Sequence, residues 1–235
     1  MNCLLIEPEE LEAGTGRVRL DDRRRRHAQK ILGVQPGDRL RVGIVNGRLG
    51  QGEVTRLDDA VLELDVVLDE APPAKLSIDL VLALPRPPVF RRLLSTIASL
   101  GVGRLLVVGT ARTEKSFWQS HVLEPQAIRE RLLLGLEQAR DTVLPEVRTH
   151  RYFESLVDEV LPPWIEGRRA LLAHPGAADC PRGVSEPVTL FVGPEGGIVD
   201  YEVERLRAIG FEAVGLGERA LRVEPVIPLL VGRLV

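Results

Sequence analysis

The chain has 235 residues, of which 44% are hydrophobic, and its 31 lysines and arginines against 34 acidic residues leave a formal net charge of -3. This length accommodates one large or two small domains, and the mild charge gives no global attraction for a polyanion, so a nucleic acid would have to bind a local patch. No apolar stretch reaches the roughly 18 residues of a membrane span, and the two cysteines, Cys3 and Cys180, lie far apart, so we expect a cytoplasmic protein without a membrane partner.

The first 70 residues are typical of short strands separated by turns. Three segments show apolar runs or alternation, namely residues 39–45, 47–57 and 60–68. Asn46-Gly47 and Asp58-Asp59 between them are hairpin signals. One helix pattern, at residues 21–32, interrupts the strands. This combination predicts a small β-barrel domain over residues 1–70.

The helix predicted at residues 21–32 is strongly basic. Its cations are Arg23, Arg24, Arg25, Arg26 and Lys30. Clustered arginine and lysine side chains release counterions from a nucleic-acid backbone, so these five residues are the expected RNA contacts. A solvated helix face is the alternative, because four consecutive arginines cannot all share one face.

The remainder of the chain alternates strands with helices. Residues 69–74 predict a linker, because Pro72 and Pro73 interrupt both helices and central strands. Strands are expected at residues 77–84, 105–109, 146–149, 170–173, 188–192 and 212–216. Helices are expected at residues 89–100, 125–140, 153–160, 200–209 and 225–235. Alternation of this kind favours an α/β domain with a mostly parallel sheet over residues 74–235.

A Gly-Pro-Glu-Gly-Gly loop, residues 193–197, follows the apolar run at 188–192. The run has the length of a buried parallel strand, and a helix pattern begins at Asp200. Two glycines free to adopt positive φ let the backbone approach a ligand at the carboxyl end of the strand, where open α/β sheets bind small molecules. A tight turn that uses glycine only for its geometry is the alternative.

A second unusual loop, residues 216–224, follows the strand expected at 212–216 and leads into an apolar C-terminal helix that begins at Pro225. Arg222 and Glu224 flank one apolar residue at the entry of this helix. Such a pair contributes little to stability as a surface contact. Beside the glycine-rich loop, however, it places charged groups near a ligand-binding edge.

Together these segments resemble the ribosomal small-subunit RNA uridine-N3 methyltransferases of the SPOUT class. The resemblance rests on residues 193–197, 216–217 and 221–224, on Leu172-Ala173-His174-Pro175, and on Glu137-Gln138, residues 145–147, residues 100–102, Arg25-Arg26-His27, Leu32 and Gly37-Asp38. It covers nearly the whole chain in the order typical of the family.

The resemblance implies a C-terminal trefoil knot, a PUA-like RNA-binding barrel in front of it, and a homodimer that packs near the C-terminal helix and the cofactor loops. It also implies S-adenosyl-L-methionine as the cofactor and ribosomal RNA or the small ribosomal subunit as the partner. The cofactor-binding residues that it implies are Leu172, His174, Val192, Gly193, Pro194, Glu195, Gly196, Gly197, Leu216, Gly217 and Leu221. A role in the conformation of its own loop is the alternative for Glu195.

The reaction implied is direct methyl transfer to N3 of a uridine in 16S ribosomal RNA. N3 is weakly acidic and must lose its proton before it attacks the methyl group, so the enzyme needs a base or a cation that stabilises the anion. Arg222 is the expected stabilising cation, and Glu224 is expected to orient Arg222 or to accept a proton. Because N3 lies on the pairing edge, the base must be unpaired or extruded.

The chain departs from the family pattern at a few positions. The family usually has threonine at the positions of Val223 and Pro225, lysine and glutamate at those of Thr96 and Ser99, and glycine and arginine at those of Arg140 and Asp141. These departures leave two alternatives open. One is an RNA-binding protein of the same fold that has lost catalysis, and the other is a methyltransferase acting on another RNA or on a small molecule.

Other enzyme classes lack their signatures in this sequence. His27, His121, His150 and His174 have no metal-ligand spacing among themselves or with the cysteines, so no metal is expected. The dinucleotide-binding, Walker A and Gly-x-Ser-x-Gly patterns do not occur at the required places.

Overall fold

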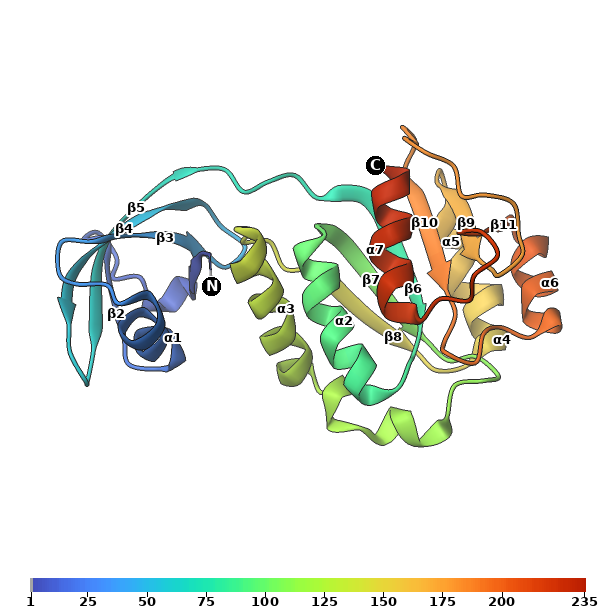
Figure 1. Ribbon diagram of the computed structural model, residues 1–235, viewed down its shortest axis with the longest axis horizontal. Coiled ribbons are helices and arrows are strands. Elements are labelled where there is room, and N and C mark those ends of the chain that lie inside the picture. The colour runs from blue at the N-terminus through green and yellow to red at the C-terminus, as the bar shows by residue number, and fades with distance from the viewer. Residues whose placement is uncertain (1) are drawn as a thin grey trace. The chain divides into compact units, whose positions relative to one another are not determined.

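The computed structural model describes residues 2–235, and the chain divides into two compact units (Figure 1). The first unit comprises Met1–Ala74 and Leu133–Leu144, and the second comprises Lys75–Leu132 and Pro145–Val235. The grouping of residues 133–144 with the N-terminal segment is a feature that the linear boundaries expected from the sequence, 1–70 and 74–235, do not contain. Met1 of that first range lies outside the described residues.

The first unit is built on one five-stranded sheet. Its strands are β1 (Leu4–Ile6), β2 (Arg17–Leu20), β3 (Arg39–Ile44), β4 (Leu49–Leu57) and β5 (Leu62–Glu70). They are arranged in the order β1-β3-β4-β5-β2, with β1 parallel to β3 and the other pairs antiparallel. The three hairpin strands were expected, whereas β1 and β2 are too short to show a period in the sequence. Alternate side chains, such as Ile6, Val42, Val54 and Leu64, form the core of this unit.

The basic segment forms a short helix, as its pattern predicted. Helix α1 (Arg23–His27) continues as a π-helical turn over Ala28–Leu32. It begins at Asp22, whose carboxylate accepts the Arg24 N–H at 2.8 Å. It ends at Gly33, which has a left-handed φ of 64° that suits glycine at a helix C-terminus.

The last two turns of helix α3 (Pro125–Ala139) and the segment after it pack within the first unit. The Asn2 N–H donates to the Glu137 carbonyl at 3.1 Å, and the Thr142 hydroxyl donates to the Gly47 carbonyl at 2.5 Å. The Leu144 N–H donates to the Asn46 side chain at 2.9 Å. These bonds join residues almost a hundred positions apart or more, which explains why a linear reading does not group them.

The second unit contains a six-stranded, fully parallel sheet. Its strands are β6 (Leu76–Ala83), β7 (Val102–Val108), β8 (Glu146–His150), β9 (Arg169–Ala173), β10 (Val188–Val192) and β11 (Glu212–Val214). The spatial order is β11-β9-β10-β6-β7-β8, and every neighbouring pair is parallel. All six strands and the parallel sheet were expected from the alternation of the sequence.

Helices cover both faces of this sheet (Figure 1). Helices α2 (Pro87–Ser99) and α7 (Val223–Leu234) lie on one face. The other face carries α4 (Phe153–Ser155), a π-helical turn over Leu156–Val160, α5 (Leu161–Ile165) and α6 (Asp200–Ala208), whose apolar side chains pack with those of the sheet. Short 3-10 turns at Lys115–Gln119 and His121–Leu123 precede α3. None of the helices within residues 2–235 combines the length and hydropathy of a membrane span.

Helix α7 begins two residues before the expected Pro225. Arg222 occupies its N-cap position, and Pro225 and Pro228 both lie inside the helix. Pro225 is still in the first turn, where backbone N–H groups have no intrahelical partner. The earlier start places Glu224 in the first turn of the helix and Arg222 at its N-cap position.

Candidate functional site

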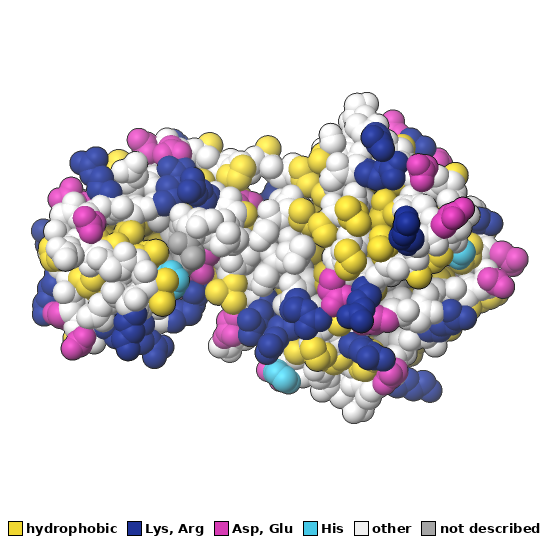
Figure 2. All heavy atoms as spheres, in the orientation of Figure 1, with side chains coloured by type: hydrophobic (Ala, Val, Ile, Leu, Met, Phe, Trp, Pro, Cys, Tyr) yellow, Lys and Arg dark blue, Asp and Glu magenta, His cyan; other side chains and the backbone are white. Residues whose placement is uncertain are grey.

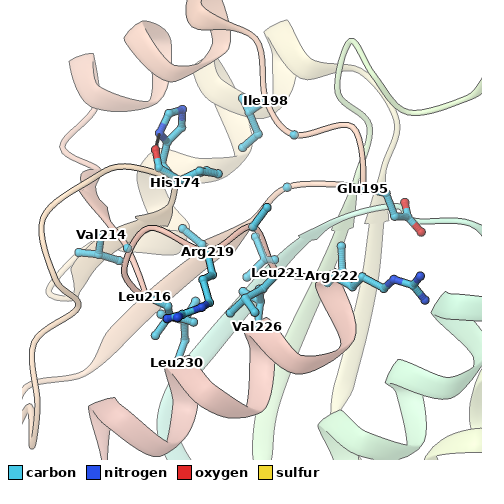
Figure 3. A pocket seen from close by; sticks show the side chains of 18 of the residues that line it. His174, Glu195, Ile198, Val214, Leu216, Arg219, Leu221, Arg222, Val226 and Leu230 are labelled. Atoms are coloured by element: carbon cyan, nitrogen blue, oxygen red, sulfur yellow. Dashed lines mark hydrogen bonds between the residues drawn. The ribbon is translucent and has the colours of Figure 1, made fainter.

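A cavity of about 230 Å³ lies at the carboxyl ends of β9, β10 and β11, which are neighbours in the parallel sheet (Figure 3). Three connecting segments and the first turns of α7 line it. The first segment lies at the end of β9 (residues 173–175), the second at the end of β10 (192–198) and the last at the end of β11 (214–222). The lining residues are Ala173, His174, Pro175, Val192, Gly193, Pro194, Glu195, Gly197, Ile198, Val214, Gly215, Leu216, Gly217, Arg219, Ala220, Leu221, Arg222, Val223, Val226 and Leu230. The location is the one at which open α/β sheets bind ligands.

The glycine-rich loop after β10 depends on its glycines for specific reasons. Gly197 adopts a φ of +74°, and its N–H closes a turn on the Pro194 carbonyl at 2.8 Å. A Cβ on Gly193 would lie 2.8 Å from Cγ1 of the buried Ile198. A side chain at Gly197 would strain the backbone, and a side chain at Gly193 would displace Ile198, which lines the cavity.

Glu195 connects this loop to helix α2. Its Oε1 accepts the N–H of Arg86, the N-cap residue of α2, at 3.2 Å. The helix N-terminus carries a partial positive charge that favours a carboxylate there. This contact supports a role for Glu195 in the conformation of its loop, although its side chain also lines the cavity.

The first cavity segment is held by His174. Its N–H donates to the Val214 carbonyl at 2.9 Å, and its ring Nδ1 lies 2.9 Å from the Pro175 carbonyl. With Nδ1 as the donor, the ring stabilises the turn that follows β9. These bonds join the segments after β9 and β11 into one wall of the cavity.

Two arginines of the last segment line the cavity. Arg219 and Arg222 are both exposed, and Figure 3 shows their side chains coming from the chain just before α7. Arg222 was expected at the site from its position beside the C-terminal helix. Arg219 was missed, although a cation inside a glycine-containing loop at a strand end is itself a usable signal.

Glu224 does not line the cavity. Its Oε1 accepts a hydrogen bond from the Arg92 guanidinium at 2.7 Å, which joins α7 to α2. This bond lowers the pKa of the Glu224 carboxyl below its ordinary value, assisted by the backbone N–H of Glu224 itself. A lower pKa makes the carboxylate a weaker base, and the charge of Arg222 also contributes to lowering it. The contact that the structure shows for Glu224 is the ion pair that joins the two helices.

Two of the expected cofactor residues lie elsewhere. Leu172 is fully buried within β9, because alternate side chains of a central strand enter the core. Gly196 faces away from the cavity, against the side chain of Arg112. Conversely, apolar positions such as Ile198, Val226 and Leu230 line the cavity and were missed, because a buried side chain near a site has no distinct sequence pattern.

In the first unit, the five basic residues of the helix differ in how far their side chains are already bound by other residues of the protein. Arg24 is 8% exposed and is bound to Glu10, to Asp22 and to the Leu5 carbonyl, so it leaves the set expected to contact RNA. Arg23 makes a two-point ion pair with the buried Glu137, at 3.1 and 2.7 Å.

The other three basic side chains of this helix differ in their contacts. Arg25 donates to Gln29 and to the Asp58 carbonyl. Arg26 and Lys30 are exposed. Within residues 2–235, no group of three or more histidine, cysteine or carboxylate side chains has the geometry of a metal site.

Comparison with known proteins identifies similar chains. Residues 72–233 match the family model described as the RNA methyltransferase domain. Ribosomal RNA small subunit methyltransferase E of Treponema pallidum is 30% identical over 233 residues, which cover 95% of this chain and 86% of that protein. The protein of the same name from Synechocystis sp. is 27% identical, with 93% of this chain and 72% of that protein covered.

A solved structure shares the fold over almost the full length. It is the ribosomal RNA small subunit methyltransferase E of Neisseria gonorrhoeae bound to S-adenosyl methionine, with a TM-score of 0.75 at 22% identity. The alignment covers 98% of this chain and 95% of that chain.

The state of Glu224 is testable by titration. Arg92→Ala removes the guanidinium that lowers the pKa of the Glu224 carboxyl, so we expect that pKa to rise toward its ordinary value. Carbon-detected NMR of glutamate side chains measures it, with Glu224→Gln as the assignment control. Arg91→Ala, one residue away and exposed, is the matched variant and is expected to leave the titration unchanged. A Glu224 pKa that is the same in the parent and in Arg92→Ala would contradict the ion pair.

Proposed function

The chain belongs to the RNA methyltransferase domain family, and on that premise we propose that it transfers the methyl group of S-adenosyl-L-methionine to N3 of a uridine in 16S ribosomal RNA. Small-subunit ribosomal RNA methyltransferases that align with most of the chain support the substrate class. The observation that carries the proposal is the cavity formed by three loops at the ends of neighbouring strands, with a guanidinium at its edge. Action on ribosomal RNA also favours a cytoplasmic location.

The cavity suits a cofactor of this kind. Its lining combines apolar side chains such as Val192, Leu216 and Val226 with backbone groups of the loops 193–197 and 215–221. Apolar walls with a few polar groups are typical of cofactor sites, and main-chain N–H and C=O groups can recognise an adenine. S-adenosyl-L-methionine supplies an electrophilic methyl group when it is bound there.

Arg222 is the group that we propose acts on the substrate. Uracil N3 loses its proton to solvent water, which leaves negative charge on N3 and the two carbonyl oxygens. N3 then forms a bond to the methyl carbon while the bond between that carbon and the sulfonium sulfur breaks, and S-adenosylhomocysteine leaves. A guanidinium beside the cavity stabilises that charge and fixes the base in place. Because Glu224 is bound to Arg92, we propose that stabilisation of the uracil anion, and not proton abstraction by this carboxylate, is the contribution of the α7 entry.

Three residues that depart from the family pattern, Val223, Thr96 and Ser99, have contacts in the structure that are compatible with this activity. Val223 is buried in the first turn of α7, so an apolar side chain at this position packs into the protein. The Thr96 hydroxyl donates to the Arg92 carbonyl and the Ser99 hydroxyl to the Ser95 carbonyl, both within α2. Of these three residues, Val223 lines the cavity, and Thr96 and Ser99 do not.

We further propose that the C-terminal segment forms the trefoil knot of the SPOUT class and that α7 is part of a homodimer interface. Figure 2 shows hydrophobic side chains gathered over α7. Leu229 is 49% exposed, and Leu221 just before the helix is 43% exposed. Exposed apolar patches of this kind mark interaction sites.

For the first unit we propose a PUA-like RNA-binding role. In this proposal the domain of residues 1–70 binds the RNA, and the domain of residues 74–235 carries out methyl transfer. Arg26 and Lys30 are exposed helical cations, Arg23 is exposed but paired with Glu137, and Arg25 is half-buried. In the second unit, Figure 2 shows basic side chains around α2. The basic residues at the start of this helix are Arg86, Arg91 and Arg92, and the Arg86 N–H is bonded to Glu195, which lines the cavity. Phosphate contacts at such positions orient an RNA without reading its sequence.

Filling the cavity tests the function. Ala220→Trp places an indole in the cavity wall, so we expect S-adenosyl-L-methionine binding, measured by calorimetry, to fall below detection while the thermal unfolding midpoint stays close to the parent value. The parent protein with labelled cofactor and unmodified small-subunit ribosomal RNA is expected to yield labelled 3-methyluridine on nucleoside analysis, and Ala220→Trp is not.

Ala208→Trp, at an exposed position of α6 outside the cavity, is the matched control and is expected to behave as the parent protein. Parent protein that binds the cofactor but labels another nucleoside would indicate a methyltransferase with a different substrate. Parent protein that binds RNA but no cofactor would indicate the catalytically inactive alternative.

Charge reversal tests the RNA surface. Arg26→Glu with Lys30→Glu removes two exposed cations, so we expect weaker RNA binding and a slope of log affinity against log salt that is shallower by roughly 1.5. Arg24 is left intact because its reversal would bury an unpaired charge. Cofactor affinity should be unchanged.

The matched control reverses Arg39 and Arg48, two exposed cations of the same unit outside the helix. An equal loss of RNA affinity in both double variants would mean that net charge, and not the helix, determines binding. No loss in either would place the RNA surface elsewhere.

A further inference from the structure

The turn at residues 110–113 does not line the cavity, but it contacts the glycine-rich loop on the side that faces away from the cavity. Residues 110–113 follow β7, and they belong to none of the three cavity segments. The guanidinium of Arg112 in this turn donates a hydrogen bond to the Gly196 carbonyl. Nothing in the sequence around Arg112 singles it out, and neither the cofactor nor the substrate roles above use it.

The turn is firmly built. A Cβ on Gly109, just before it, would lie 2.0 Å from the Arg151 carbonyl oxygen, so the chain leaves β7 in close contact with the residues after β8. The Thr113 N–H donates to the Thr110 carbonyl at 3.0 Å, and the Thr110 N–H donates to the Thr113 hydroxyl at 3.2 Å. The backbone that carries Arg112 therefore has little freedom.

A buried carboxylate attaches this turn to the exit of the glycine-rich loop. Glu202 of α6 is 2% exposed. Its Oε1 accepts the Ala111 N–H at 2.6 Å, and its Oε2 accepts the Val199 N–H at 3.2 Å. Val199 is the N-cap residue of α6, two residues after the last glycine of the loop. Because a buried carboxylate without hydrogen bonds is costly, these two bonds strongly favour one relative position of the turn and the loop exit.

Arg112 also packs on the loop. A Cβ on Gly196 would lie 3.3 Å from both Cβ and Cδ of Arg112, so the aliphatic part of the arginine covers the outer face of Gly196. Gly196 has no positive φ, and a side chain at this position would be in tight contact with Arg112. The inner face of the same loop, at Gly193 and Gly197, lines the cavity.

We propose that Arg112, held in place by Glu202, is a positioning residue for the cofactor site: it supports the glycine-rich loop from outside, so that the backbone groups of the loop face the cavity before any ligand binds. This inference rests on the proposed function for the identity of the ligand. A preformed loop lowers the ordering cost of binding, so the contact acts on cofactor affinity and not on the chemical step.

The test compares Arg112→Ala and Glu202→Gln with the parent protein by hydrogen exchange without ligand. We expect the Gly197 and Val199 amides, bound to Pro194 and Glu202, to exchange about tenfold faster, with little change in the thermal unfolding midpoint. Lys115→Ala and Glu204→Gln, exposed neighbours on the same elements or next to them, are the matched controls and should exchange as the parent protein does. Unchanged exchange at residues 196–199 in both variants would overturn the proposal.

Cofactor binding gives the second measurement. Arg112→Ala is expected to raise the dissociation constant for S-adenosyl-L-methionine about tenfold, the loss typical of one hydrogen bond to a charged group, while kcat at saturating cofactor stays within about twofold. Arg112→Lys, which keeps one donor, should recover part of the affinity. A fall in kcat with an unchanged dissociation constant would contradict a positioning role.

The two measurements separate this proposal from the proposed function. Faster exchange in the variants of a protein that binds no S-adenosyl-L-methionine would support the loop contact and reject the assigned ligand.

Discussion

The conformation of one short loop determines what the second unit can bind. The glycine-rich loop leaves β10 between two neighbouring strands and must expose backbone groups on its inner side while it turns into α6. Within the loop, the turn from Pro194 to Gly197 is closed by one hydrogen bond. One bond is not enough to fix the conformation of the whole loop. Contacts from three other elements complete it: the start of α2 through Arg86, the turn after β7 through Arg112, and α6 through Glu202.

Charge in this protein is used mainly in pairs. Arg92 neutralises Glu224, and Arg24 is surrounded by Glu10 and Asp22. For Arg24, burial by itself would lower the pKa of the guanidinium, but its hydrogen bonds to Glu10 and Asp22 outweigh that effect, so the net shift is upward and the side chain stays charged. Fewer arginines and lysines are therefore free to bind a polyanionic partner than the sequence contains. This agrees with the slightly negative net charge of the chain.

The sequence predicted the backbone of the fold well, because the signals for it are local. Apolar runs of strand length, helix periods between them and the Gly-Pro-Glu-Gly-Gly turn all lie within short windows. The ion pairs were not predictable in the same way. Arg23 and Glu137 are 114 positions apart, and Arg92 and Glu224 are 132 positions apart, so a run of arginines does not reveal which of them are already paired.

Arg140 shows how a departure from a family pattern acquires a physical meaning. The family pattern that the sequence resembles implies glycine at this position, and Arg140 adopts a φ of 57°, the left-handed conformation that glycine favours. The next residue, Asp141, is buried and accepts the N–H groups of Thr142 and Val143 at 2.6 and 3.0 Å. The backbone at the end of α3 thus keeps the shape that the usual residue suggests, although the side chains differ.

A crystal structure of the protein with S-adenosyl-L-methionine tests the central claim most directly, since that claim concerns a loop already shaped for its ligand. The account predicts the cofactor in the cavity, in contact with backbone groups after β9, β10 and β11, and a loop at residues 193–198 that superimposes on the conformation described above, with the Arg112–Gly196 contact intact. Cofactor bound at another place, or bound in the cavity only after this loop has rearranged and released Arg112, would contradict it.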